Sequence, residues 1–149
     1  NRSIDYVNPF ILFPGSVDFS QNLHALKWFC KQVLPFVALN KIKIYVTGSV
    51  SEPNRKLFCD YDVIQFTGEI DNNSLTKLYE SCLCVIAPIT TGTGLKIKIL
   101  EATQQGVPVV TTKFASKGIQ SNICMYGQND SPESFASILN EYISKIMNR

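Results

Sequence analysis

The sequence predicts a doubly wound α/β fold, a mostly parallel sheet of about six strands in one domain that spans residues 1–149. Short apolar runs of strand length alternate with longer segments in which apolar residues recur every three or four positions, which is typical of βαβ units. Hydrophobic residues make up 45% of the chain and charged residues 17%, so the chain can bury one core without disulfides or metals.

The expected strands are the apolar runs that come first in each pair. FILFPG is stopped by Pro14 and Gly15, and LCVIAP is a continuous apolar run of the kind found in a central strand covered on both faces. The six expected strands are residues 10–15, 41–48, 62–68, 83–88, 107–112 and 123–127.

Amphipathic segments between these runs are the expected helices. Residues 22–37 carry one apolar stripe and predict a single helix, a short helix is expected near 52–60, and 72–82 predict a helix that Asn73 or Ser74 can cap. The next helix should begin within about two residues of Gly94. The last begins at Ser131, with a proline at its first position.

Charge and hydropathy exclude several classes of function. A formal charge of +2 without a long Lys/Arg run argues against a nucleic-acid surface, although a local anion site is compatible with it. No apolar run reaches the roughly 18 residues of a membrane span, so a soluble domain is expected, and peripheral membrane association would come only from parts outside this chain.

Cysteine and histidine usage favours neither a metal site nor a disulfide framework. The only closely spaced cysteines, Cys82 and Cys84, fall in a predicted strand in which they would point the same way, and buried thiols are favoured over a metal or redox pair. A reducing, cytoplasmic compartment follows. The single histidine, His24, is expected on a helix surface or in packing. Because the chain begins at Asn1, we expect a processed protein or a piece of a longer one.

The stretch GTGLKIKILEA at 92–102 is the strongest functional signal. Glycines at a helix start let an anion approach the unpaired backbone N–H groups, which predicts a phosphate cradle. Gly94, Lys98 and Glu101 share one helix face, whereas Leu95, Ile99 and Ala102 share another. Lys98 could then contact a phosphate, and Glu101 could accept hydrogen bonds from a sugar diol. The alternative is a Lys98–Glu101 surface ion pair beside a tight turn.

Two common nucleotide-binding motifs are absent from the sequence. The first strand is not followed by G-x-G-x-x-G, and the chain has no G-x-x-x-x-G-K-[ST] phosphate loop. These absences weaken nicotinamide and nucleoside-triphosphate interpretations.

Three blocks in this order and spacing resemble the donor-binding half of GT-B glycosyltransferases of group 1, the retaining family 4 type. LFPGSVDFSQN at 12–22 resembles the first strand and loop of that family. The segment at 63–88 resembles its G-x-(V/I)-x-x-x-x-L-x-x-x-Y block and fourth strand. The segment at 92–112 resembles its G-x-G-x-(R/K)-x-K-x-x-E-A-x-x-x-G-x-P-V-V-x-T signature. The resemblance covers most of the chain and implies a Rossmann-like half of the GT-B fold.

The resemblance also implies which residues bind a nucleotide-sugar donor. Glu101 matches the glutamate that binds the ribose hydroxyls, and Gly68, Glu69 and Ile70 would border the base. The diphosphate would be held by Gly15, Ser16, Gly92, Thr93, Gly94, Leu95, Lys96 and Lys98. This group can stabilise the charge of the leaving diphosphate without a metal or cofactor, and no catalytic residue is assigned in this chain.

The sequence departs from the family pattern at three positions. Many members have a second glutamate where this chain has Thr93, and an arginine and a lysine where it has Ser16 and Gln21. GT-B enzymes also have an amino-terminal domain that holds the acceptor, which this chain lacks. The expected function is therefore donor binding within a glycosyltransferase that acts on a glycan or lipid acceptor, with little or no transfer by the isolated domain.

Two other functions remain open at this point. One is a nucleotide-sugar epimerase of GT-B architecture, whose acids and bases would have to be found in a chain with one histidine. The other is a non-catalytic module of flavodoxin-like shape. Such a module would normally have acidic residues at the end of its first strand, where this chain has Pro14 and Gly15.

Overall fold

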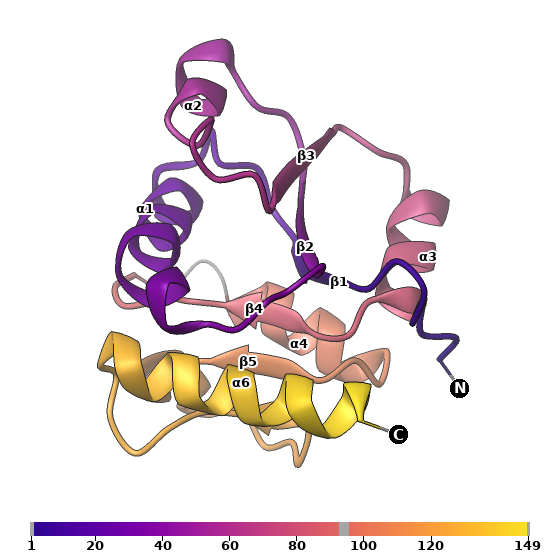
Figure 1. Ribbon diagram of the computed structural model, residues 1–149, viewed down its shortest axis with the longest axis vertical. Coiled ribbons are helices and arrows are strands. Elements are labelled where there is room, and N and C mark those ends of the chain that lie inside the picture. The colour runs from indigo at the N-terminus through magenta and orange to yellow at the C-terminus, as the bar shows by residue number, and fades with distance from the viewer. Residues whose placement is uncertain (1, 93–95, 149) are drawn as a thin grey trace.

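The computed structural model describes residues 2–92 and 96–148, and its centre is a sheet of six parallel strands in the order β3-β2-β1-β4-β5-β6 (Figure 1). This confirms the predicted doubly wound α/β fold, and each strand lies inside its predicted range. The strands are β1 (Phe10–Phe13), β2 (Lys43–Thr47), β3 (Ile64–Gly68), β4 (Val85–Ala87), β5 (Val109–Thr111) and β6 (Cys124–Met125).

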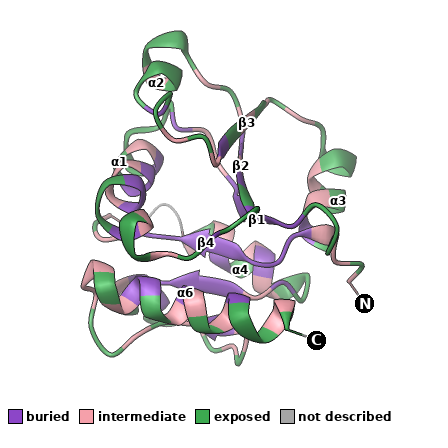
Figure 2. Cartoon of the chain, in the orientation of Figure 1, coloured by how far each residue is buried: buried purple, intermediate pink, exposed green. Residues whose placement is uncertain are grey.

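Helical segments cover both faces of this sheet. They are α1 (Ser20–Trp28), η1 (Phe29–Val33), η2 (Leu34–Phe36), α2 (Glu52–Lys56), α3 (Asn72–Ser81), α4 (Lys96–Gln104), α5 (Lys113–Ser116) and α6 (Pro132–Met147). One core cluster joins the sheet to α1, η1 and α6, and a second joins it to α3, α4 and α5. The buried strands between these layers are coloured purple in Figure 2, and α2 is largely exposed.

The single helix predicted over residues 22–37 is wrong in detail. After α1 the chain forms the π-helix η1, in which the Leu34 N–H reaches the Phe29 carbonyl, and then the 3₁₀ turn η2. Pro35 explains the change, because it has no N–H and its ring obstructs the carbonyl four residues earlier. The apolar stripe still packs inward, with Leu26 and Phe29 fully buried.

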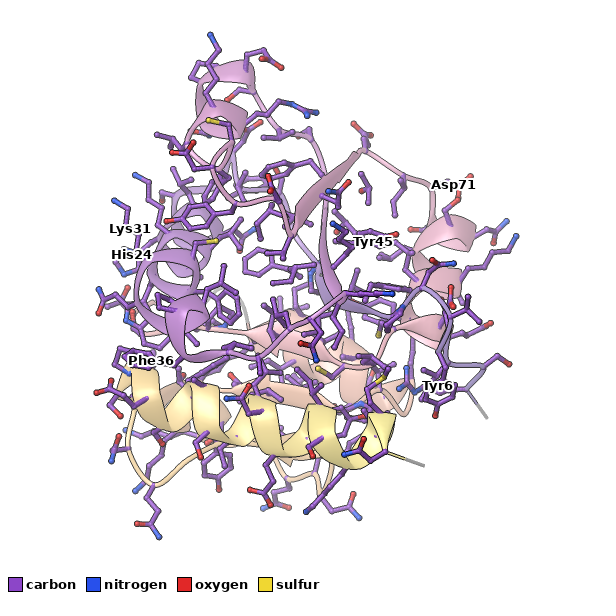
Figure 3. All side chains as sticks on the ribbon, viewed as in Figure 1. Tyr6, His24, Lys31, Phe36, Tyr45 and Asp71 are labelled. Atoms are coloured by element: carbon purple, nitrogen blue, oxygen red, sulfur yellow. The ribbon has the colours of Figure 1, made fainter. Side chains whose placement is uncertain are left out.

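The cap of α3 also differs from the prediction. The Asp71 carboxylate accepts a hydrogen bond from the Ser74 N–H at 2.7 Å, so Asp71 is the N-cap rather than Asn73 or Ser74 (Figure 3 labels Asp71 at this helix start). This bond lowers the pKa of Asp71. Asp71 is the preferred cap because its carboxylate is an anion that accepts a hydrogen bond at the positive end of the helix.

Two further helix starts follow ordinary capping rules. The Ser131 hydroxyl accepts from the Ser134 N–H at 3.1 Å, and Pro132 is the first residue of α6, as predicted. The one-turn helix α5 was not predicted. It is capped by Thr112, whose hydroxyl accepts from the Ala115 N–H at 3.1 Å.

The five cysteines are free thiols, four of them buried and only Cys59 exposed. The prediction that Cys82 and Cys84 point the same way is wrong, because the two side chains belong to the two different core clusters. Cys82 ends α3 instead of lying in a strand, so the alternation of a strand does not apply to this pair. Burial raises the pKa of Cys82 to about 11. Within the described residues no helix is long and apolar enough to cross a membrane.

Candidate functional site

The site lies where the strand order reverses. β1 stands between β2 and β4, so the chain leaves β1 toward one side of the sheet and later leaves β4 toward the other. The helices that follow, α1 and α4, pack on opposite faces. The loops after β1 and β4 therefore diverge and leave a crevice at the carboxyl ends of the strands, where ligands of doubly wound sheets bind.

A cavity of about 470 Å³ occupies this crevice. Its lining comes from the loop after β1, the first turn of α1 and one residue of α4. The lining residues are Gly15, Ser16, Phe19, Ser20, Gln21, Asn22 and Lys98. Three residues predicted to bind a diphosphate, Gly15, Ser16 and Lys98, are thus brought together from distant parts of the chain.

The floor of the cavity is a tightly held loop. The Gly15 N–H donates to the Thr47 hydroxyl at 3.0 Å, and the Asn22 amide donates to the Ser16 carbonyl at 2.8 Å. Gly15 has a φ of 137°, and a Cβ there would lie 2.8 Å from Asn22 Nδ2. A side chain at position 15 would therefore break the floor, because left-handed backbone and close contact both require glycine.

Hydrogen bonds to the loop after β2 hold this floor in place. The Asp18 carboxylate accepts from the Ser51 N–H at 3.0 Å and from the Asn54 amide at 2.9 Å. These bonds, the one from Ser51 first, lower the pKa of Asp18. The Ser16 hydroxyl donates to the Ser49 carbonyl, which adds a second link between the two loops.

Helix α4 places Lys98 and Glu101 together on one partly exposed face, apart from the buried face, as predicted from their spacing. Ile99 and Ala102 are fully buried against the sheet, whereas the side chains of Lys98 and Glu101 are 35% and 41% exposed. Their charged atoms lie 3.6 Å apart, so the ion pair that the sequence offered as an alternative is present. Lys98 also lines the cavity. Lys98 therefore both pairs with Glu101 and lines the cavity.

The other residues of the predicted cradle are less closely tied to the cavity. The Lys96 ammonium donates to the Lys117 carbonyl at 3.3 Å, and Lys96 does not line the cavity. Gly92 has a φ of 84°, and a Cβ there would lie 2.7 Å from Gln21 Nε2, so the loop after β4 meets the start of α1. Thr93, Gly94 and Leu95, together with the predicted helix start at Gly94, lie outside the described residues.

The residues predicted to border a base lie at the same edge of the sheet but outside this cavity. Gly68 ends β3 with a φ of 73°, and its carbonyl accepts from the Gly48 N–H at 3.1 Å. Glu69 is exposed and Ile70 is half-buried. β2 separates β3 from β1, so a ligand would have to extend along this edge to reach them.

Two polar residues near the cavity, Asn22 and His24, make contacts that sequence reasoning did not predict. Asn22 is 6% exposed, and its amide oxygen is buried without a hydrogen-bond partner among residues 2–92 and 96–148. Its signal was a polar residue in register with the buried stripe of Leu26 and Phe29. His24, labelled on α1 in Figure 3, is a surface residue as expected, with its ring 3.3 Å from the Thr90 hydroxyl after β4.

The described part of this region contains no metal-binding cluster. Among the described residues no group of three or more His, Cys, Asp and Glu side chains could hold a metal ion. Of the residues that the structure describes, Lys98 is the charged side chain that lines the cavity, and its partner Glu101 lies outside the lining.

Known proteins share both the sequence pattern and the fold. The sequence profile of a family described as Glycosyl transferases group 1 matches residues 8–145. A protein of Klebsiella pneumoniae, described as an uncharacterized 44.6 kDa protein in the cps region, is 29% identical over 126 residues, which is 79% of this chain and 32% of that protein.

Two solved structures have the same fold. WaaG, a glycosyltransferase involved in lipopolysaccharide biosynthesis, superposes with a TM-score of 0.70 at 16% identity, over 93% of this chain and 39% of that one. Anabaena Alr3699/HepE, solved in complex with UDP and glucose, gives 0.67 at 15% identity, over 95% and 40%. The chain thus spans about a third to two fifths of these proteins. With the profile matched along nearly its whole length, the chain belongs to the group 1 glycosyltransferases.

Proposed function

We propose that this chain is the nucleotide-sugar donor-binding domain of a retaining glycosyltransferase that transfers a sugar to a glycan or lipid acceptor. The observation that carries the proposal is the cavity between the ends of β1 and β4, where the loop of Gly15 and Ser16 faces Lys98. Family membership supports the class of reaction. The complex of the Anabaena protein with UDP and glucose makes uridine diphosphate the first ligand to test.

The chemistry of the cavity suits a diphosphate beside a ribose. Lys98 supplies a positive charge at the lining, and Glu101, one helical turn further, supplies a carboxylate that accepts hydrogen bonds from hydroxyl groups. The backbone of Ser16 and of the segment 92–95 would add N–H groups, Gly15 would shape the floor beneath the diphosphate, and Lys96 would add a second charge. Gly68, Glu69 and Ile70 would border the base. Such donors stabilise the charge that develops on a departing diphosphate.

The lengths of similar structures support a division of roles between two domains. The WaaG and Anabaena structures are more than twice as long as the part matched here. We therefore propose that a second domain holds the acceptor, that catalytic residues lie outside this chain, and that the isolated domain binds the donor with little or no transfer.

Lys98 provides the test of the diphosphate. Calorimetry would compare UDP with uridine for the wild type and Lys98→Ala, at low and high salt. We expect Lys98→Ala to weaken UDP more than uridine, because only UDP carries the phosphate charge, and the difference to shrink in high salt. Lys145→Ala is the matched control, since Lys145 pairs with Glu141 at 3.2 Å on α6, away from the cavity.

The outcome separates the two interpretations of Lys98. An exposed helix-face ion pair contributes only about 0.3 to 0.5 kcal/mol, so a lysine with no other role would leave ligand discrimination unchanged. Equal losses for uridine and UDP would exclude the phosphate role. Absence of UDP binding by the wild type, extended to the other nucleoside diphosphates, would refute the donor-binding proposal itself.

Glu101 provides the test of the ribose. Glu101→Ala should remain folded, because a carboxylate 41% exposed adds little to the core, and should lose roughly 1 to 3 kcal/mol of UDP affinity, the usual size for a charged acceptor. A variant that unfolds without a separable binding defect would instead assign Glu101 to the fold.

A further inference from the structure

Tyr79 carries a buried hydroxyl that has no hydrogen-bond partner among the described residues. The residue lies on α3, is 1% exposed, and belongs to the core cluster that also holds Ile99 and Ala102 of α4. Its phenolic oxygen is buried and has no hydrogen-bond partner within residues 2–92 and 96–148. The two α4 residues of this cluster are immediate neighbours of the turn that carries Lys98 and Glu101.

An unsatisfied buried hydroxyl is unfavourable to the fold, because the group loses water and gains nothing in exchange. Tyr142 shows the usual arrangement in the same protein: its hydroxyl donates to the Leu83 carbonyl at 2.8 Å. Phenylalanine at position 79 would fill the same space without an unpaired oxygen. A partner for the Tyr79 hydroxyl would therefore have to be a group that does not bond to it in the described part of the chain.

Glu101 lies on α4 between Ile99 and Ala102, the two α4 residues that share a core cluster with Tyr79. The pKa of Tyr79 is raised by burial first and then by the negative charge of Glu101, so the phenol keeps its proton and can donate. In this structure Glu101 pairs with Lys98 at 3.6 Å. Because both side chains are more than a third exposed, that pair is weak and a phosphate at Lys98 would compete with it.

We propose that Tyr79 is a positioning residue for Glu101. When a diphosphate draws Lys98 away, the Tyr79 hydroxyl donates to one carboxylate oxygen of Glu101 and leaves the other to accept from the ribose hydroxyls. This deepens the proposed function and rests on it for the identity of the ligand. The intramolecular half of the proposal is that the Tyr79 hydroxyl donates to Glu101 once Lys98 no longer pairs with it. This half depends on no ligand.

A stability cycle tests the intramolecular half without any nucleotide. In the wild type, Tyr79→Phe should leave the midpoint of unfolding unchanged or raise it, because it removes an unpaired oxygen. In Lys98→Ala, where Glu101 has lost its cation and can turn to Tyr79, the same substitution should lower the midpoint. Tyr142→Phe is the control and should lower the midpoint in both backgrounds, because it breaks an existing bond. An effect of Tyr79→Phe that is the same in both backgrounds would overturn the proposal.

Ligand discrimination tests the second half. Tyr79→Phe should weaken UDP by about tenfold, the range for a hydrogen bond to a charged group, and leave 2′,3′-dideoxyuridine diphosphate unchanged. Tyr142→Phe should leave both affinities unchanged. Equal losses for the two ligands, or no loss for UDP, would overturn the positioning role. If the stability cycle behaves as expected but UDP does not bind, the donor function fails while the Tyr79–Glu101 contact stands.

Discussion

Gly48 does not itself line the cavity, but one methyl group added there should damage the candidate site. It follows β2 with a φ of 90°, and a Cβ built on it would lie 2.8 Å from the Ser16 nitrogen and 2.9 Å from the Ser16 Cα. These are backbone atoms, which cannot rotate aside as the end of a side chain can. Gly48→Ala should therefore displace the loop that forms the cavity floor.

The expected size of this effect has two parts. A left-handed backbone costs a residue with a Cβ about 1 to 2 kcal/mol. Pushing packed backbone aside costs about 1 to 3 kcal/mol more. Gly106→Ala isolates the first part, because Gly106 has a φ of 76° and a Cβ there would meet nothing within 4 Å.

Urea unfolding of the two variants and calorimetry with UDP would measure both consequences. Gly48→Ala should be less stable than Gly106→Ala by the steric part, and it should bind UDP more weakly, since Ser16 lines the cavity. Gly106→Ala, after the end of α4, should keep the wild-type affinity. If both variants lose the same stability and keep the same affinity, the loop after β2 does not support the site.

Three other changes test the capping, charge and burial described above. Ser131→Ala should destabilise the fold by about 1 kcal/mol through loss of the α6 cap, whereas Ser137→Ala, exposed within the same helix, should not destabilise it. Asp18→Asn should lower stability at neutral pH. Hydrogen bonds from Ser51 and Asn54 lower the folded-state pKa of Asp18 below its ordinary value of 3.8. The contribution of Asp18 to stability is therefore complete above pH 3.8 and is lost as pH falls through the folded-state pKa, where urea unfolding should show the two proteins converging. A thiol reagent should modify Cys59 rapidly and the other four cysteines only after unfolding, since burial raises their pKa values and hides them.

The strands could be predicted because a parallel strand covered on both faces needs a continuous apolar run, which is a local property. The apolar pattern could not reveal a change in backbone hydrogen bonding that leaves the same side chains buried. The stripe from Leu26 to Val33 points inward in an α-helix and in the π-helix η1 alike, and only Pro35, near its end, signals the shift. The α3 cap was misassigned for a related reason, since Asp71 stood one residue before the range taken as helix.

In the candidate site, too, some features follow from local spacing and others depend on contacts between distant elements. Lys98 and Glu101 are one turn apart on one helix, so their common face follows from spacing. Residues two apart on a helix point in nearly opposite directions, and the Lys96 ammonium donates to the Lys117 carbonyl. The place of Lys96 at the diphosphate therefore stays a prediction. Tyr79 was visible only as part of a motif, since an unsatisfied hydroxyl is a property of contacts between α3 and α4.

The ion pair between Lys98 and Glu101 and the binding of a phosphate by Lys98 are compatible, because the pair is too weak to exclude a ligand. Each side chain is more than a third exposed, and such pairs contribute about 0.3 to 0.5 kcal/mol, far less than the binding of a diphosphate in a cavity with fixed donors. Without a ligand, the pair keeps Lys98 at the cavity and neutralises Glu101. A phosphate that takes Lys98 leaves Glu101 charged and in need of donors. A ribose diol can supply these donors from the ligand, and a buried phenol can supply one from the protein. Binding of phosphate at Lys98 would then favour binding of ribose at Glu101, and that coupling disappears if either side chain is removed.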